Sequence, residues 1–438
     1  MHLDESALSG ATRTYRRYFL ATSAQGLGFL SASGAAFGQT PESRIRQLIQ
    51  AYEKQGFHRT GTQTDNASGI WLRDQVRRIG VTTALEGFTL QRIDPVLASL
   101  TAGERRIEGI PLFDGGFTNK NGVTDQFGVL NSGAPIGLTE SLPNAAGAGA
   151  LGDARRMNRH KAIICITRGG RPGLCPSNAD SFLQPFGPTV LQVSSEHAAW
   201  LQEAARKGIS VQVVAQVIRT PAEAFNVTGK IAGADPALPP LIVMTPRSGW
   251  YWCASERGGG IACWLELIRS LREVKPSRDI LFVASSGHEL GHLGINAFVD
   301  QRPGIVKRSA GWIHLGANIG ATSVSEEGPR DANSNLPPSA ALLRSRGNTL
   351  QSSDNEFQEM LEEAMNAVGL RVATPMPHDR IPGGEAEVVH RGGGQYVSVI
   401  GGNANFHNPN DRGPDVVDVH AIATFVQAFA TVAMKLAK

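Results

Sequence analysis

The sequence is poor in several features, and each shortage argues against a class of function. Its 42 Lys and Arg against 39 Asp and Glu leave a net charge of +3, without a basic run that would indicate a nucleic-acid partner. Beyond the N-terminal region no apolar run is long enough to cross a bilayer, so we expect no membrane span in the mature chain. The lack of a Gly-x-Ser-x-Gly motif disfavours an α/β-hydrolase triad. Nothing indicates an oligomeric state.

Cysteine is also scarce, with four residues in a chain of 438. Cys165 and Cys175 lie ten residues apart, as do Cys253 and Cys263, and neither spacing is that of a zinc knuckle. In an oxidising compartment either pair could form a disulfide. Buried free thiols are the other open interpretation, because spacing does not show geometry.

The chain is rich in glycine, with 50 residues, and has 24 prolines, which indicates many turns and long loops. Its length suits two domains and a leader. Arg16 and Arg17 precede a mildly apolar stretch at 21–36 that resembles the core of a twin-arginine export signal. We therefore predict a signal peptide over 1–38 and a periplasmic or secreted protein. A disordered tail with a chance arginine pair is the alternative.

The periodicity of apolar residues predicts an α/β protein. Helical periods occur in the first hundred residues and again after residue 226, whereas the region between has short apolar runs separated by Gly, Pro and Asn. We expect a β-rich insert at 105–225. The expected elements around it are helices at 42–53, 67–79, 260–272, 356–368 and 418–438, and strands at 87–93, 240–244 and 280–283.

Residues 288–292, His-Glu-Leu-Gly-His, match the helical motif in which two histidines bind zinc and the glutamate activates water. Their context favours another interpretation. Residues 279–287 form an apolar run that ends in small turn residues, which places His288 at the end of a buried strand. Three glycines between 287 and 294 disfavour a helix, and the third histidine of the extended motif is missing.

Four segments follow one another in an order typical of one family: 59–62 with the helix after it, 226–231, 282–294 and 406–411. In this order the chain resembles the zinc aminopeptidase family, which includes glutamate carboxypeptidase-like ectodomains and glutaminyl cyclases. The resemblance implies a phosphorylase/hydrolase-like mixed sheet with helices on both faces. It implies a catalytic domain at 39–104 and 226–438, with 105–225 as a protease-associated-like insert.

The family binds two metal ions, and this chain retains only part of that site. The family's His-x-Asp falls at 246–248, which reads Pro-Arg-Ser here, and a later Asp is replaced by Gly316. The two ligands that bind only one of the family's two metal ions are therefore missing. The other metal's ligands correspond to Glu256, Glu289 and His407. Two carboxylates and one imidazole suffice for a single zinc ion with an open position for water.

His288 replaces the first glutamate of the family's acidic pair, which is the general base. An imidazole can accept a proton from water near neutral pH, so His288 is our candidate catalytic residue, with a role as an extra metal ligand as the alternative. Arg257 beside Glu256 lowers the negative charge and argues against two dications. Further candidates for the pocket are Ser248, Trp250, Arg257, His292, His314, His378 and His390.

Together these features predict an exported hydrolase of amide or peptide bonds with a reduced, mononuclear zinc site, acting on a peptide or small amide substrate. The rival hypothesis is a catalytically inactive binding or scaffold protein on the same fold, without metal. In that case Glu256 would pair with Arg257 or Arg247, and His288 would be a hydrogen-bonded turn residue. The chemistry of the site must decide between them, because the fold alone does not.

Overall fold

The computed structural model describes residues 39–322, 349–370 and 374–438. The predicted signal peptide at 1–38 lies outside them. The chain divides into Met1–Thr40 and one compact unit, Pro41–Lys438.

The predicted opening helices are confirmed as α2 (Pro41–Glu53) and α3 (Gln63–Ile79). The Oγ1 atom of Thr62 accepts the N–H of Asp65 and caps the start of α3, and Gly80 ends the helix in the left-handed conformation. Such a cap pairs a backbone donor that has no partner within the helix. The sequence therefore specifies both ends of α3 locally.

The larger part of the unit is a mixed sheet covered on both faces, as expected. Its strands run in the order β7-β9-β8-β10-β13-β11-β12, and β9, β8, β10 and β13 are parallel neighbours. The bounds are β7 (Ser210–Ile231), β8 (Leu241–Pro246), β9 (Ile280–Ser285), β10 (Gly311–Leu315), β11 (Thr349–Ser352), β12 (Thr374–Pro375) and β13 (Tyr396–Ile400).

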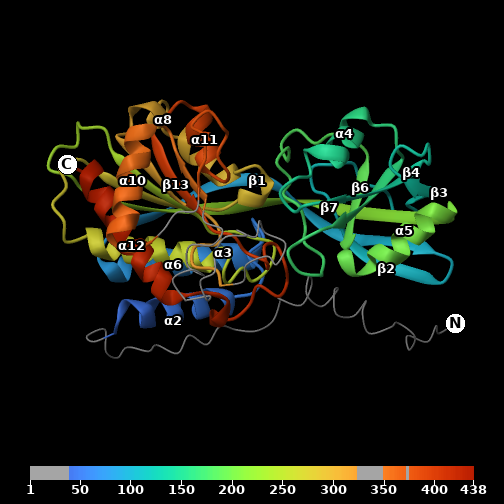
Figure 1. The fold of residues 1–438 in the computed structure, drawn as a ribbon, viewed down its shortest axis with the longest axis horizontal. Coiled ribbons are helices and arrows are strands. Elements are labelled where there is room, and N and C mark those ends of the chain that lie inside the picture. Colours follow the sequence, from blue (N-terminus) through green and yellow to red (C-terminus); the bar gives the residue numbers. More distant parts are fainter. Residues whose placement is uncertain (1–38, 323–348, 371–373) are drawn as a thin grey trace, which may run out of the picture. The chain divides into compact units, whose positions relative to one another are not determined.

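Alternate residues of the central strands enter two different cores, as the period of a strand requires. Val243 packs in the core with α2, α3, α6 (Gly258–Leu271), α10 (Asn355–Ala367) and α12 (Val419–Leu436). Its neighbours Ile242 and Met244 pack on the other face with α7 (Leu293–Asp300), α8 (Ile305–Arg308) and α11 (Ala386–Arg391). Figure 1 shows α8 and α11 on one side of the strands and α2, α3 and α6 on the other.

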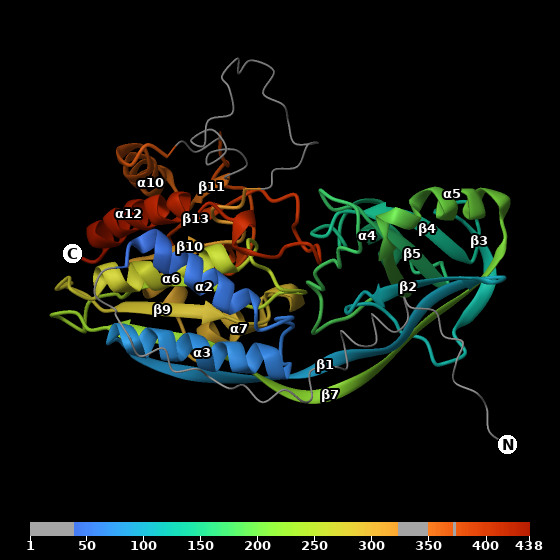
Figure 2. The ribbon, with the colours of Figure 1, turned by 90° about the horizontal axis from the view of Figure 1, so that it is seen from below.

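The smaller part contains most of the predicted insert and has its own cores. Strand β1 (Thr82–Ala102) pairs with β7 along most of its length, and the two ribbons continue from the large sheet into the insert (Figure 2). Around them lie β2 (Arg105–Pro111), β3 (Val123–Val129), β4 (Ile136–Ser141), β5 (Ala162–Thr167), β6 (Thr189–Ser194), α4 (Gly149–Met157) and α5 (Ala198–Lys207). Two apolar clusters fill this part. Strand β7 runs through the predicted boundary at 225.

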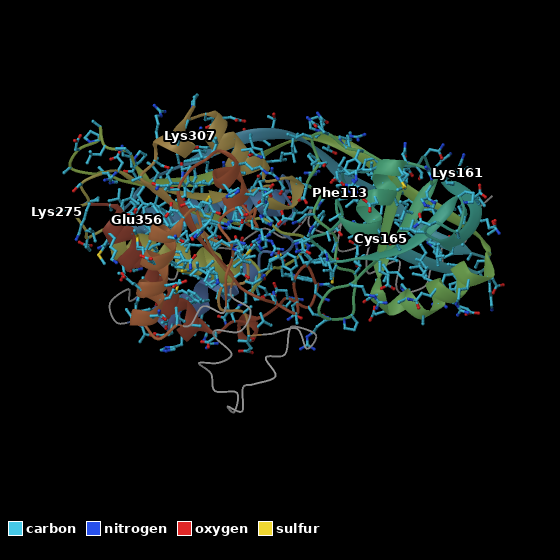
Figure 3. The ribbon with its side chains drawn as sticks, turned by 45° about the horizontal axis from the view of Figure 1, so that its top comes forward. Phe113, Lys161, Cys165, Lys275, Lys307 and Glu356 are labelled. Carbon is cyan, nitrogen blue, oxygen red and sulfur yellow. The ribbon has the colours of Figure 1, made fainter. Side chains whose placement is uncertain are left out.

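All four cysteines are buried free thiols, so of the two interpretations the second holds. Burial raises the pKa of Cys165, labelled in Figure 3, to about 12, so this thiol stays protonated. Among the described residues one helix, α12, is long and apolar enough to cross a membrane by length and composition alone. Most of its buried side chains belong to the core it shares with α6.

Candidate functional site

The candidate residues lie on loops that follow the parallel strands. Strand β8 leads into 247–257, β9 into 286–292 and β13 into 401–411. Because the carboxyl ends of parallel strands meet at one edge of a sheet, these loops converge there. Each contains a non-glycine residue with positive φ, namely Cys253 at 52°, His292 at 61° and His407 at 55°. Strained backbone of this kind gathers at functional sites.

The histidine-rich turn has the structure predicted from its context. Strand β9 ends at Ser285, a short 3-10 turn spans His288–Leu290, and α7 begins only at Leu293. His288 and His292 therefore do not lie one turn apart on an α-helix, although their rings lie 5.1 Å apart. The interpretation that places His288 after a buried strand is confirmed.

Arg257 joins the two predicted carboxylate ligands. Its Nη2 atom lies 2.9 Å from Oε1 of Glu256 and 3.0 Å from Oε1 of Glu289. Ser248 completes the arrangement, since its Oγ donates to Oε2 of Glu289 at 2.9 Å and its carbonyl accepts from Nε of Arg257 at 2.6 Å. The side chains of Arg257, Glu256 and Glu289 are at most 3% exposed. We call Glu256, Arg257, Glu289 and His407 the arginine cluster.

His407 is the fourth member, and both of its ring nitrogens face acceptors. Nδ1 lies 2.6 Å from the carbonyl oxygen of Pro176, so it carries a hydrogen. Nε2 lies 3.3 Å from Oε1 of Glu256. The ring of His407 therefore lies between the insert and Glu256.

The electrostatics keep the pair at the centre ionised. Burial alone would raise the pKa of Glu256, but the guanidinium of Arg257 and the imidazole of His407 outweigh it and hold this pKa at about 2. Burial lowers the pKa of Arg257, and the carboxylates of Glu256 and Glu289 more than reverse that effect. The positive charge of Arg257 is therefore permanent.

The zinc ion that the resemblance implies does not fit this arrangement. The three predicted ligands are brought together, but around a guanidinium. A zinc ion on Oε1 of Glu256 would lie within about 5 Å of Arg257 Nη2, given Zn–O bonds of about 2 Å. At an effective dielectric constant near 20, that repulsion is about 7 kcal/mol. Among the described residues, no group of three or more His, Cys, Asp and Glu side chains could hold a metal.

A second buried group lies beside the arginine cluster and is centred on Glu385. Its Oε1 lies 3.1 Å from Nδ1 of His288 and accepts from Ser285 Oγ at 3.2 Å. Its Oε2 lies 3.2 Å from Nε2 of His314, whose Nδ1 lies 2.8 Å from Ser398 Oγ. Glu385 is fully buried. One carboxylate thus orients His288 and His314, which were proposed from the sequence as separate candidates.

The charges in this second group favour a protonated His288. Burial opposes ionisation of Glu385, but the charge of His288 and the hydrogen bonds from His288 and His314 hold its pKa well below the usual value. For His288, burial lowers the pKa, and Glu385 more than compensates and raises it. Burial, with the nearby His288, lowers the pKa of His292 to about 4. His292 is therefore neutral at pH 7.

Arg247 forms a third buried ion pair, away from Glu256. Its Nη1 lies 2.7 Å from Oδ1 of Asp65, and both side chains are fully buried. Oδ2 of Asp65 also accepts from Gly61 N–H and Ser286 Oγ. Arg247 thus anchors α3 to the loop after β8, and Asp65 ties the same helix to the loop after β9 through Ser286. Of the two arginines considered as partners of Glu256, the structure selects Arg257.

The remaining pocket candidates lie in different places. His378 lies 2.8 Å from Asn355 Oδ1, and His390 lies 3.3 Å from the hydroxyl of Tyr396. Within the described residues neither makes a hydrogen bond or ion pair with the arginine cluster or with Glu385. Sequence reasoning did not find Glu385 or Asp65. The only local sign of Glu385 is its place at the end of a glycine-rich turn.

Trp250 lines a small cavity beside Glu289, together with Arg59, Leu290 and Phe113, which is labelled in Figure 3. The space open to the centre of a water molecule is about 10 Å³, which is room for one water. The indole N–H of Trp250 and the hydroxyl of Thr60 have no partner among the described residues. In this conformation only a water-sized group fits beside Glu289.

The chain resembles known proteins in structure and not in sequence. No family model matches the chain, and no curated protein matches it. Solved structures do match over 91% of the chain. A zinc aminopeptidase from Bacillus subtilis has a TM-score of 0.70 and 17% identity, with 94% of its own chain covered. An aminopeptidase from Aneurinibacillus sp. strain AM-1 has a TM-score of 0.65 and 15% identity, with 94% of its own chain covered. A peptidase M28 precursor from Shewanella amazonensis has a TM-score of 0.66 and 14% identity, with 97% of its own chain covered. The chain therefore has the fold of the zinc aminopeptidases.

Proposed function

We propose that this chain is an exported binding protein on the aminopeptidase fold, with a peptide or small amide as its ligand and no bound zinc. The observation that carries the proposal is the contact of one Arg257 nitrogen with both Glu256 and Glu289. A guanidinium there supplies the positive charge that two buried carboxylates require. Ligand binding needs only the fold and its loops, so it survives the exchange of a metal for an arginine.

Metal analysis of protein purified without added metal tests the proposal. We expect less than about a tenth of an equivalent of zinc and an unchanged melting temperature on chelation, since a bound metal stabilises the folded state. One equivalent of zinc, with a melting temperature that falls on chelation, would refute it. For the ligand, dipeptides and amino-acid amides should raise the melting temperature, and no rise with any of them would count against this ligand class.

A second candidate function is hydrolysis without metal, favoured by the contact between His288 and Glu385. Because Nδ1 of His288 is held by Glu385, its Nε2 is the nitrogen left to exchange protons with a water molecule. A screen of amides and esters in the presence of a chelator tests this idea. Turnover that His288→Ala abolishes and His378→Ala leaves intact would establish hydrolysis, and a fully negative screen would leave the binding function.

The proposed export rests on the arginine pair at 16–17. The proposed likeness of the insert to a protease-associated domain rests on the resemblance of the chain to the zinc aminopeptidase family. The proposal places the mature chain in the periplasm or outside the cell. A fusion of residues 1–40 to a reporter that is active only after export in the folded state tests whether these residues are an export signal. Replacing Arg16 and Arg17 by lysine should abolish export, and unchanged export would exclude a twin-arginine signal.

A further inference from the structure

A segment of the insert lies directly over the arginine cluster. Residues 168–180, between β5 and β6, have no regular secondary structure, yet residues 174–179 are all buried. The segment contacts all three loops that carry the candidate site. We call it the cover segment and ask what it does to access.

The cover segment bonds to the site mainly through its backbone. The carbonyl of Pro176 binds Nδ1 of His407 at 2.6 Å, and the N–H of Ala179 donates to the carbonyl of Glu289 at 2.8 Å. Both partners belong to the arginine cluster. The cover segment therefore touches the cluster itself, and its position also decides how the ring of His407 is oriented.

Two further contacts tie the cover segment to the loops after β8 and β13. The hydroxyl of Tyr251 donates to the carbonyl of Leu174 at 3.0 Å. The amide of Asn408 donates to the carbonyl of Pro172 at 3.1 Å and lies 3.5 Å from Sγ of Cys175. Leu174 and Ala179 are buried, and neither belongs to the four apolar clusters given above for the described residues. Polar contacts, which water can replace, thus contribute to the docking of the cover segment.

Glycine allows the close approach. A Cβ atom at Gly170 would lie 2.7 Å from Cα of Ala404, so the cover segment reaches the loop after β13 only because this side chain is absent. Gly173 has φ +142°, a conformation that other residues rarely adopt. At the far end, Gly187 has φ +80°. Glycines with conformations that other residues rarely adopt therefore lie on both sides of the buried stretch.

We propose that residues 168–180 act as a movable cover, which must lift from the loops after β8, β9 and β13 before a ligand can reach the arginine cluster. The cluster is at most 3% exposed with the cover in place, and the cavity beside Glu289 holds one water. A binding site closed so completely needs a local opening. Local openings of this kind occur without global unfolding. The inference does not depend on which ligand binds.

Hydrogen exchange under native conditions tests the movement, because the N–H of Ala179 is protected only while the cover is docked. We expect the peptide 174–180 to exchange at least about tenfold faster than the core strand β5, with β5 exchanging only on global unfolding. Equal rates for the two peptides would refute the proposal. Labelling of buried Cys253 by a maleimide, followed by mass spectrometry, reports whether the opening reaches the site.

Two variants shift the cover in opposite directions. Asn408→Cys places a thiol opposite Cys175, and oxidation with glutathione disulfide should lock the cover and slow both exchange at 174–180 and labelling of Cys253. The same variant in reduced form is its control. Gly170→Ala should wedge the cover open and accelerate both, whereas Gly147→Ala, where an added Cβ meets nothing within 4 Å, should change neither. If the lock slows exchange but leaves labelling of Cys253 unchanged, the cover does not control access.

Discussion

Arg257 lies 2.9 Å from Glu256, its neighbour in sequence, and both side chains are buried on a fold whose relatives in solved structures include zinc aminopeptidases. Nη2 of Arg257 also reaches Glu289, so a single nitrogen binds two carboxylates from different loops. Removing one partner of such a pair leaves uncompensated buried charge, which is far more costly than losing a surface ion pair.

Arg257→Ala should lower the free energy of unfolding by about 3–5 kcal/mol, because Glu256 and Glu289 would then be buried without their shared cation. Urea unfolding at pH 7 measures the loss. Arg106→Ala, which removes the half-exposed pair with Glu108, should cost less than about 1 kcal/mol and serves as the control. A loss at Arg257 no larger than that at Arg106 would mean that the cluster does not need its guanidinium.

The same variant should acquire affinity for zinc. Nε2 of His407 lies 3.3 Å from Oε1 of Glu256, about the separation of two ligands on a tetrahedral zinc with bonds of about 2 Å. With the guanidinium gone, Glu256, Glu289 and His407 are free to serve as ligands. Added zinc should raise the melting temperature of Arg257→Ala by several degrees and leave the wild type unchanged. The triple variant with His407→Ala and Glu289→Ala should show no rise.

The sequence predicts the strands and turns of the site better than its side-chain contacts. Strands and turns depend on residues close together in sequence, whereas the contacts join residues far apart in sequence. The strand 280–283 and the turn after it are local patterns, and they place His288 and Glu289 correctly. Glu385 meets His288 across 97 residues of sequence and His314 across 71, and Arg247 meets Asp65 across 182. No periodicity encodes contacts of that kind. Helix α4 escaped notice because it is only nine residues long and lacks a side-chain cap at its start.

Glu385→Ala should release His288 and His314 together, since one carboxylate holds both rings. Without it, His288 loses the group that raises its pKa, so burial and Arg257 should make the ring neutral and more reactive towards diethyl pyrocarbonate. Mass spectrometry of the peptide with His288 gives the rate of modification. Glu387→Ala, which removes a partly exposed neighbour on α11 bonded to Arg391, is the matched control. Equal rates in the two variants would show that Glu385 does not govern His288.

His58 should make the protein less stable as the pH falls from 7 to 5. The ring is fully buried, stacked on Tyr52 at 3.7 Å, and its Nε2 lies 3.1 Å from the carbonyl of Tyr52. Burial is the largest effect and lowers the pKa of His58 to about 3. Between about pH 3 and 6.5 the unfolded chain therefore binds more protons here than the folded one, so stability rises with pH across that window and is lost as the pH falls.

Over 1.5 pH units below 6.5, this single group accounts for about 2 kcal/mol. His58→Phe keeps a ring stacked on Tyr52 but cannot be protonated. Urea unfolding of both proteins at pH 7 and pH 5 should show that the wild type loses about 2 kcal/mol more than the variant over this interval. Parallel losses in the two proteins would mean that His58 is not held neutral in the folded state. The comparison subtracts the other histidines, because both proteins contain them.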